Sequence, residues 1–151
     1  MASDTTSETK ISTQITEEGI GMAKNEKFTV HTGRDIKLTT EDIDGIMVSA
    51  LEGGINYWCC DAEVVEEKRC ADWGHEQIAR GGVLILHDCE SDDQWELDLE
   101  KFLKGFKMWV ENGDDEYGAV QKDGSVDTSE IDAGMADMIV QYALFGEIVF
   151  G

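Results

Sequence analysis

The clearest pattern in the sequence is a change of apolar period within residues 95–110. Trp95 and Leu97 alternate with acidic residues, which is the period of a half-buried strand. Large apolar residues then repeat at helical spacing: Leu99, Phe102, Leu103, Phe106, Trp109 and Val110. We therefore expect a short strand that leads directly into an amphipathic helix, and Gly113 is expected to end that helix.

A second helix is predicted within residues 39–54. Thr39 can cap its start, and Asp42 stands three residues later at the capping-box position. The residues that follow have helical apolar spacing on one face: Ile43, Ile46, Met47, Ala50 and Leu51. We expect Gly53 and Gly54 to end this helix, because glycine accepts the left-handed conformation of a C-cap.

A third helix is predicted after residue 127. Asp127 and Glu130 have the spacing of a capping box at its start, and Gly146 is expected to stop it. Its inner face would consist of Ile131, Met135, Met138, Ile139 and Tyr142. Residues 147–150 can then return as a terminal strand.

The remaining patterns predict a hairpin, a broken helix and a buried strand. Residues 28–31 and 34–38 flank a Thr-Gly turn, as in a β-hairpin. We expect residues 63–80 to be helical, with a break near Gly74. Residues 83–86 form a short apolar run that is typical of a buried strand.

Together these elements predict one α+β domain, with three to four helices packed on a small, mainly antiparallel sheet. We assign residues 27–151 to this acidic domain. Residues 1–26 are rich in Ser, Thr, Glu and Lys and poor in large apolar residues, which predicts a flexible N-terminal arm.

Charge restricts the partners that the chain can bind. The sequence has 33 Asp and Glu against 12 Lys and Arg, a formal net charge of −21. Non-specific binding to nucleic acid depends on Lys and Arg, and so does attraction to anionic membranes, so we expect neither. No apolar run reaches the length of a membrane helix, and no signal-peptide pattern is visible. Basic proteins, cations or a small molecule remain as partners, and homo-oligomerisation stays open.

The cysteines and histidines do not predict a metal site. Adjacent Cys59 and Cys60 are a poor disulfide framework, so we expect four reduced thiols in a cytosol. The spacing of the Cys and His residues lacks the paired pattern of structural zinc: Cys59, Cys60, Cys70, His75, His87 and Cys89. No acidic window fits the calcium loop of an EF-hand. We predict no metal and no cofactor.

Catalytic motifs are missing as well. The sequence contains no nucleophile elbow, P-loop, dinucleotide fingerprint or H-E-x-x-H motif. A Cys–His pair can arise by chance, and nothing in the sequence orients its base. We therefore predict a protein that is not an enzyme.

Acidic residues are concentrated in the last part of the chain. Residues 111–151 contain ten acids and one base. Such a surface can imitate the charge of DNA, which carries about one negative charge per 1.7 Å of its axis, and can bind the basic groove of another protein. The candidate partner-binding residues are Asp114, Asp115, Glu116, Asp123, Asp127, Glu130 and Asp137. The alternative is a solvated acidic face that only keeps the protein soluble.

A second candidate site combines glycines with aromatic residues. It consists of Gly53, Gly54, Asn56, Tyr57 and Trp58. Glycine allows close backbone approach, and the aromatic rings can stack on a base or another ring. A nucleotide would need nearby cations, for which Lys68, Arg69 and Arg80 are the nearest in sequence. The alternative is a helix C-cap followed by core aromatic residues.

Three stretches occur together in an order that resembles one protein family: Ala-Leu-Glu-Gly-Gly-Ile-Asn-Tyr-Trp at 50–58, Arg-Gly-Gly at 80–82, and Ala-Asp at 136–137 with Gln-Tyr-Ala-Leu-Phe-Gly-Glu-Ile-Val-Phe-Gly at 141–151. The chain resembles, over residues 36–151, a family of small, acidic, uncharacterised proteins encoded by bacteriophages and prophages. The resemblance implies a phage accessory protein that acts in the cytoplasm of a bacterial host cell.

The hypotheses follow from these patterns and from analogy with other small acidic phage proteins. The first is a counter-defence protein, an anti-restriction or anti-CRISPR inhibitor that binds a basic, nucleic-acid-binding host effector as a DNA mimic. The second is a small-molecule binding protein, for a nucleotide signal, that uses the Tyr57–Trp58 pocket. The third is a virion or assembly component.

Overall fold

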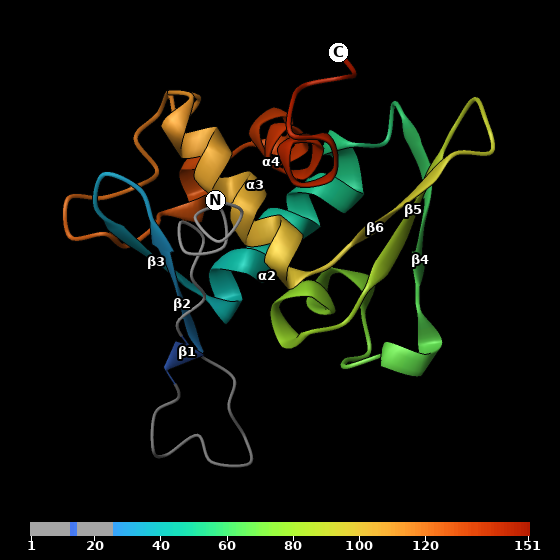
Figure 1. The fold of residues 1–151 in the computed structure, drawn as a ribbon, viewed down its shortest axis with the longest axis horizontal. Coiled ribbons are helices and arrows are strands. Elements are labelled where there is room, and N and C mark those ends of the chain that lie inside the picture. The colour runs from blue at the N-terminus through green and yellow to red at the C-terminus, as the bar shows by residue number, and fades with distance from the viewer. Residues whose placement is uncertain (1–12, 15–25) are drawn as a thin grey trace, which may run out of the picture.

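The computed structural model describes residues 13–14 and 26–151, and most of the predicted arm at residues 1–26 lies outside the described residues. Within this described part, three α-helices lie between two small antiparallel sheets (Figure 1). The helices are α2 (Thr40–Ser49), α3 (Leu99–Glu111) and α4 (Ala133–Phe145). One sheet is β1 (Thr13–Gln14), β2 (Lys27–His31) and β3 (Asp35–Thr39). The other is β4 (Cys59–Val64), β5 (Leu84–Asp88) and β6 (Gln94–Leu97). The predicted α+β class is confirmed, although two sheets form where one was expected.

The first hairpin and the start of α2 agree with their sequence signals. Strands β2 and β3 pair through the predicted turn, and their inward residues are buried. The Thr39 hydroxyl accepts the Asp42 amide at 3.0 Å, and the Thr39 amide donates to the Asp42 carboxylate at 3.0 Å. This reciprocal capping box satisfies two amides that the first helical turn leaves without partners.

The helical stretch that begins with α2 ends at the predicted glycines, but not in the predicted left-handed conformation. The helix continues through a π-helical turn, Ala50–Gly54, and neither Gly53 nor Gly54 adopts a left-handed conformation. Gly54 instead lies against the start of α4, where an added Cβ would be 2.3 Å from the carbonyl oxygen of Ala133. Glycine is therefore required here by the close approach of two backbones.

The predicted broken helix over residues 63–80 is wrong. Strand β4 occupies the first part, and three short 3₁₀ turns follow: Glu66–Lys68, Gly74–Glu76 and Ile78–Arg80. Gln77 is fully buried and organises this segment. Its amide nitrogen donates to the carbonyls of Ala71 and Trp73, and its amide oxygen accepts the amide of Cys70. The buried side-chain amide thus forms hydrogen bonds with backbone N–H and C=O groups that would have bonded to each other in a helix.

The predicted strand and helix at residues 95–110 are confirmed as β6 and α3. The side chain of Asp98 accepts the Lys101 amide at 2.9 Å and caps the helix where the strand ends. Gly105 lets α3 cross α4 closely, because a Cβ there would be 2.6 Å from the Ile139 carbonyl oxygen. The large apolar face of α3 is buried between the sheets and α4.

Helix α4 begins later than predicted. Asp127 caps a short 3₁₀ turn, Thr128–Glu130, and Asp132 is the N-cap of α4, accepting the Met135 amide at 2.8 Å. Gly146 ends the helix in a left-handed conformation, with φ of 74°, as predicted. Residues 147–150 do not form a strand. The amides of Val149 and Phe150 donate instead to the buried side chain of Gln141.

Within the part of the chain that the structure describes, no helix has the length and apolar character needed to cross a membrane.

Candidate functional site

The predicted acidic surface maps onto residues 114–132, which we call the acidic segment. The segment leaves α3, runs beside the β2–β3 hairpin and returns to α4 (Figure 1). Two contacts fix this course: the Lys37 amide donates to the Gly124 carbonyl at 2.8 Å, and the Arg34 guanidinium donates to the Lys122 carbonyl at 3.3 Å. The segment is therefore attached to the first sheet.

The first carboxylates of the acidic segment are held by uncharged donors. The Tyr142 hydroxyl donates to Asp114 at 2.6 Å. Asp115 accepts the amides of Ala119 and Val120 at 2.7 and 3.0 Å. Both carboxylates are half-buried, and these bonds fix their positions without neutralising their charge.

The next carboxylates are exposed and organise turns. Asp123 accepts the hydroxyl and amide of Ser125 at 2.7 and 2.9 Å, and these hydrogen bonds lower the pKa of Asp123. Lys37 is close enough to lower this pKa further. Asp127 accepts the hydroxyl and amide of Ser129 at 2.6 and 3.1 Å. Asp123 therefore stays ionised at neutral pH, and the hydrogen bonds of both residues hold their loop in place.

Ion pairs among the described residues do not compensate the charge of the acidic segment. Glu116 and Glu130 are exposed. Among the described residues, no ion pair includes a carboxylate of this segment. Six of the seven predicted partner-binding residues therefore form an anionic surface in which hydrogen bonds hold the four aspartates: Asp114, Asp115, Glu116, Asp123, Asp127 and Glu130.

Asp137, the seventh predicted residue, is not part of this surface. Its side chain is buried within α4, with 7% of the residue exposed. The Tyr57 hydroxyl donates to it at 2.7 Å, the Trp58 indole at 2.8 Å and the Gln141 amide at 2.9 Å. Asp137 is a structural carboxylate whose three donors offset the cost of burial.

This buried network also restrains Tyr57. Its ring is 55% exposed, but its hydroxyl is turned towards Asp137. Burial of the hydroxyl, together with the hydrogen bond to the Asp137 carboxylate, raises the pKa of Tyr57 to about 12. Tyr57 is therefore a neutral hydrogen-bond donor at physiological pH.

The predicted aromatic site is only partly assembled. Tyr57 and Trp58 line a pocket of about 270 Å³, together with Asp88, Cys89, Glu90, Phe150 and Gly151. The rings of Trp58 and Phe150 are stacked in it, with centroids 4.8 Å apart. Asn56 lines a separate depression of about 130 Å³, and Gly53 and Gly54 line neither.

The polar lining of the aromatic pocket does not suit a nucleotide. Asp88 and Glu90 supply negative charge at its edge. Two of the three predicted cations are used elsewhere, since Arg69 pairs with Glu66 at 2.8 Å and Arg80 pairs with Asp44 at 2.9 Å. Aromatic faces beside carboxylates are suited to a cationic or neutral group.

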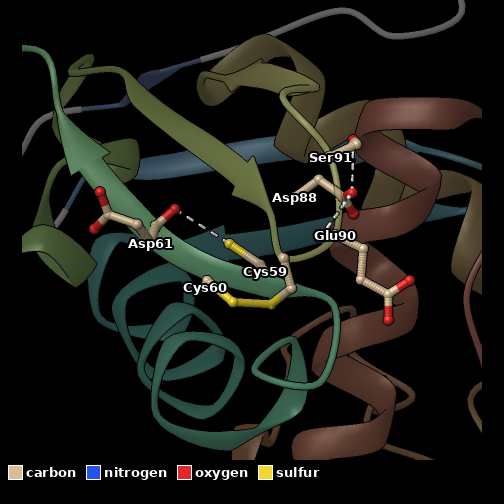
Figure 2. The surroundings of a disulfide bond; sticks show 7 residues. Cys59, Cys60, Asp61, Asp88, Glu90 and Ser91 are labelled. Carbon is tan, nitrogen blue, oxygen red and sulfur yellow. Dashed lines mark hydrogen bonds between the residues drawn. A yellow bond between two sulfur atoms is a disulfide. The ribbon is translucent and has the colours of Figure 1, made fainter.

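A disulfide beside this pocket corrects the prediction of four reduced thiols. Cys60 and Cys89 are bonded (Figure 2), because the pairing of β4 with β5 brings their Cα atoms to 4.9 Å. The adjacent Cys59 is buried, and its thiol donates to the Asp61 carbonyl at 3.3 Å. Burial raises the pKa of the Cys59 thiol, so it is poorly reactive. Cys70 is a free, exposed thiol.

Sequence reasoning also missed a cluster on the second sheet. Asp61, Glu63 and His87 lie within reach of one another, although 24 residues separate Glu63 from His87. The available signal was the alternation of the two acids along one strand. It becomes informative only once the pairing of β4 with β5 is known.

The chain was compared with protein-family models, with curated proteins and with solved structures, and none of the three comparisons gave a match.

Proposed function

We propose that this chain is a non-enzymatic binding protein of the phage counter-defence kind. In this proposal the acidic segment occupies the basic nucleic-acid-binding groove of a host protein, such as a restriction or CRISPR effector. The observation that supports the proposal most strongly is the way the carboxylates are held. Hydroxyl and amide donors hold the aspartates in place, and no ion pair within the described residues neutralises a carboxylate of the segment.

Fixed, uncompensated carboxylates are what a phosphate-binding groove can recognise. Lys and Arg in such a groove gain affinity by neutralising a regular series of anionic groups. Carboxylates that are already oriented lose little conformational freedom on binding, which removes part of the entropic cost. A segment that served solubility alone would gain nothing from such ordering.

Charge removal without loss of hydrogen bonds tests the proposal. Asn and Gln accept hydrogen bonds at the same positions but carry no charge. The segment variant combines Glu116→Gln, Asp123→Asn, Asp127→Asn and Glu130→Gln, all at exposed residues. A control variant removes the same number of charges from exposed residues outside the segment: Glu52→Gln, Glu67→Gln, Glu96→Gln and Glu100→Gln.

The tagged proteins would be used to capture partners from a bacterial extract that contains defence systems, with low-salt and then high-salt elution. We expect the wild type and the control variant to retain a nucleic-acid-binding protein that elutes with salt, because exposed charge contacts are screened. The segment variant should not retain it. Equal retention by the segment variant would contradict the proposal.

The aromatic pocket supports a second candidate function, the binding of a small molecule. Its stacked rings and its two carboxylates favour an organic cation over a nucleotide. Thermal-shift measurements with quaternary ammonium compounds and guanidinium-bearing metabolites test this candidate. Stabilisation that disappears in Glu90→Gln would support it, and no stabilisation by any of these compounds would reject it.

A further inference from the structure

The outer face of the second sheet brings three potential metal ligands together. Asp61 and Glu63 are two residues apart on β4, so their side chains lie on the same face of the strand. His87 on β5 is the register partner of Asp61. The three side chains, which we call the β4–β5 triad, place one ligand atom each within 4.8 Å of the others.

The fold positions the triad on a rigid support. Ala62 and Val64 alternate with the two acids and pack against the core, which fixes the direction of the strand face. The Cys60–Cys89 disulfide joins the two strands one residue before Asp61 and two residues after His87. Figure 2 shows the Asp61 carboxylate directed away from the disulfide. The relative position of the two strands is therefore set covalently beside the ligands.

The distances fit a metal site after small side-chain rotations. The His87 Nε2 and Glu63 Oε1 atoms are already 2.9 Å apart. Ligand bonds of about 2.0–2.2 Å place the ligand atoms of one ion roughly 3–3.6 Å from each other. The longest separation, 4.8 Å at most, thus has to shrink by about 1 Å. Asp61 and Glu63 are exposed, so their side chains can rotate without disturbing the core.

The surroundings do not oppose a cation. On the neighbouring strand β6, register places Gln94 opposite His87 and Glu96 opposite Ile85. Neither is basic, and Glu96 adds negative charge to the same face. The net charge of −21 also raises the local concentration of cations at the protein surface.

We propose that Asp61, Glu63 and His87 bind a divalent transition-metal ion. One imidazole nitrogen and two carboxylate oxygens suit Zn²⁺ or Mn²⁺ better than a purely oxygen-ligated ion such as Ca²⁺. The general order of affinities predicts tighter binding of Zn²⁺ than of Mn²⁺. Three protein ligands leave coordination positions open towards solvent, where a donor from a bound partner can complete the shell. This site is independent of the acidic segment.

Calorimetric titration tests the proposal. The untagged, disulfide-bonded protein is titrated with zinc chloride and, separately, with manganese chloride, in high salt so that diffuse binding of cations is suppressed. We expect one saturable Zn²⁺ site in the wild type. His87→Ala should weaken binding at least tenfold, and so should the double variant Asp61→Asn with Glu63→Gln. These substitutions change exposed or half-exposed side chains, and circular dichroism would verify the fold.

The chain supplies its own matched control. His31 and Asp35 form a comparable exposed pair, with 2.7 Å between Nδ1 and Oδ1, on the first sheet. His31→Ala should leave Zn²⁺ affinity unchanged. Ring signals from NMR should shift for His87 and not for His31 during the titration. Equal Zn²⁺ affinity in His87→Ala and the wild type would overturn the proposal, as would a titration without a saturable site.

Discussion

Two acidic regions at opposite sides of the molecule use the same residue types in different ways (Figure 1). In the acidic segment the aspartates accept hydrogen bonds from their own loop or from α4, and the charges are spread over the surface. On the second sheet, strand register makes two carboxylates converge on one histidine. A loop of caps and turns therefore distributes charge, whereas a paired strand concentrates it. The number of acids in the sequence cannot distinguish these outcomes.

Removal of the disulfide should have the largest effect, and it should act on the second sheet and not on the acidic segment. Cys60→Ser with Cys89→Ser opens a covalent loop with a sequence separation of 29, which should lower the free energy of unfolding by about 2–4 kcal/mol. Zn²⁺ binding by the β4–β5 triad should weaken with it, while the acidic segment keeps its partner binding. Urea unfolding measures the change in the free energy of unfolding. The wild type, with and without a reducing agent, serves as the reference. An unchanged unfolding midpoint would mean that the strands hold their register without the bond.

A buried carboxylate can be distinguished from the surface carboxylates by its effect on stability. Asp137→Ala leaves the buried Trp58 indole without its acceptor and removes one acceptor of the Gln141 amide, which should cost about 1–3 kcal/mol. The same change at exposed Glu116 should stay within about 0.5 kcal/mol. Thermal and urea unfolding of the two variants test this contrast. Similar losses in both would contradict the structural role of Asp137.

Within the acidic segment, a carboxylate that caps a helix should contribute more to the free energy of unfolding than one that caps no helix. Asp132→Ala removes the N-cap of α4 and should lower the free energy of unfolding by about 1 kcal/mol. Glu130→Ala should stay within about 0.5 kcal/mol, since Glu130 is exposed and α4 starts after it. If Glu130→Ala proved the more harmful change, the start of α4 would lie where the sequence pattern placed it.

The smallest effect concerns the titration of Tyr57. Its pKa of about 12 in the folded protein exceeds the ordinary value of 10.0, so the unfolded chain loses its proton first as pH rises. The ionisation of Tyr57 should therefore lower the free energy of unfolding between pH 10 and 12 and should have no effect on it below pH 10. The absorbance difference between the wild type and Tyr57→Phe isolates its titration. In an Asp137→Asn background the midpoint should move towards 10, and an unmoved midpoint would contradict the coupling.

Periodic patterns predicted the elements whose packing follows from local spacing. The alternation before Leu99 and the helical repeat after it gave β6 and α3, and Thr39 and Asp42 placed the start of α2. Elements that depend on one distant contact were missed. Buried Gln77 replaces the expected helix with turns, and Gly54 serves a backbone contact about eighty residues away in the sequence.

The candidate sites were predictable to a similar extent. The acidic segment is contiguous in sequence, so composition was enough to find it. Asp137 was wrongly predicted to lie on the partner-binding surface. Its donors Tyr57 and Trp58 are about eighty residues away in the sequence, and no local sequence pattern indicates a buried carboxylate. The disulfide and the β4–β5 triad both depend on the pairing of β4 with β5, which the sequence pattern did not reveal because residues 63–80 were expected to be helical.

The most direct test of the proposed function is a competition between this protein and DNA for the captured partner. The wild type and the control variant should displace DNA with similar inhibitory concentrations, and more salt should weaken both. The segment variant, in which Glu116, Asp123, Asp127 and Glu130 have lost their charge but not their hydrogen-bond acceptors, should require at least a tenfold higher concentration. A segment variant that displaces DNA as well as the wild type does would show that the exposed carboxylates of the acidic segment are not the binding surface.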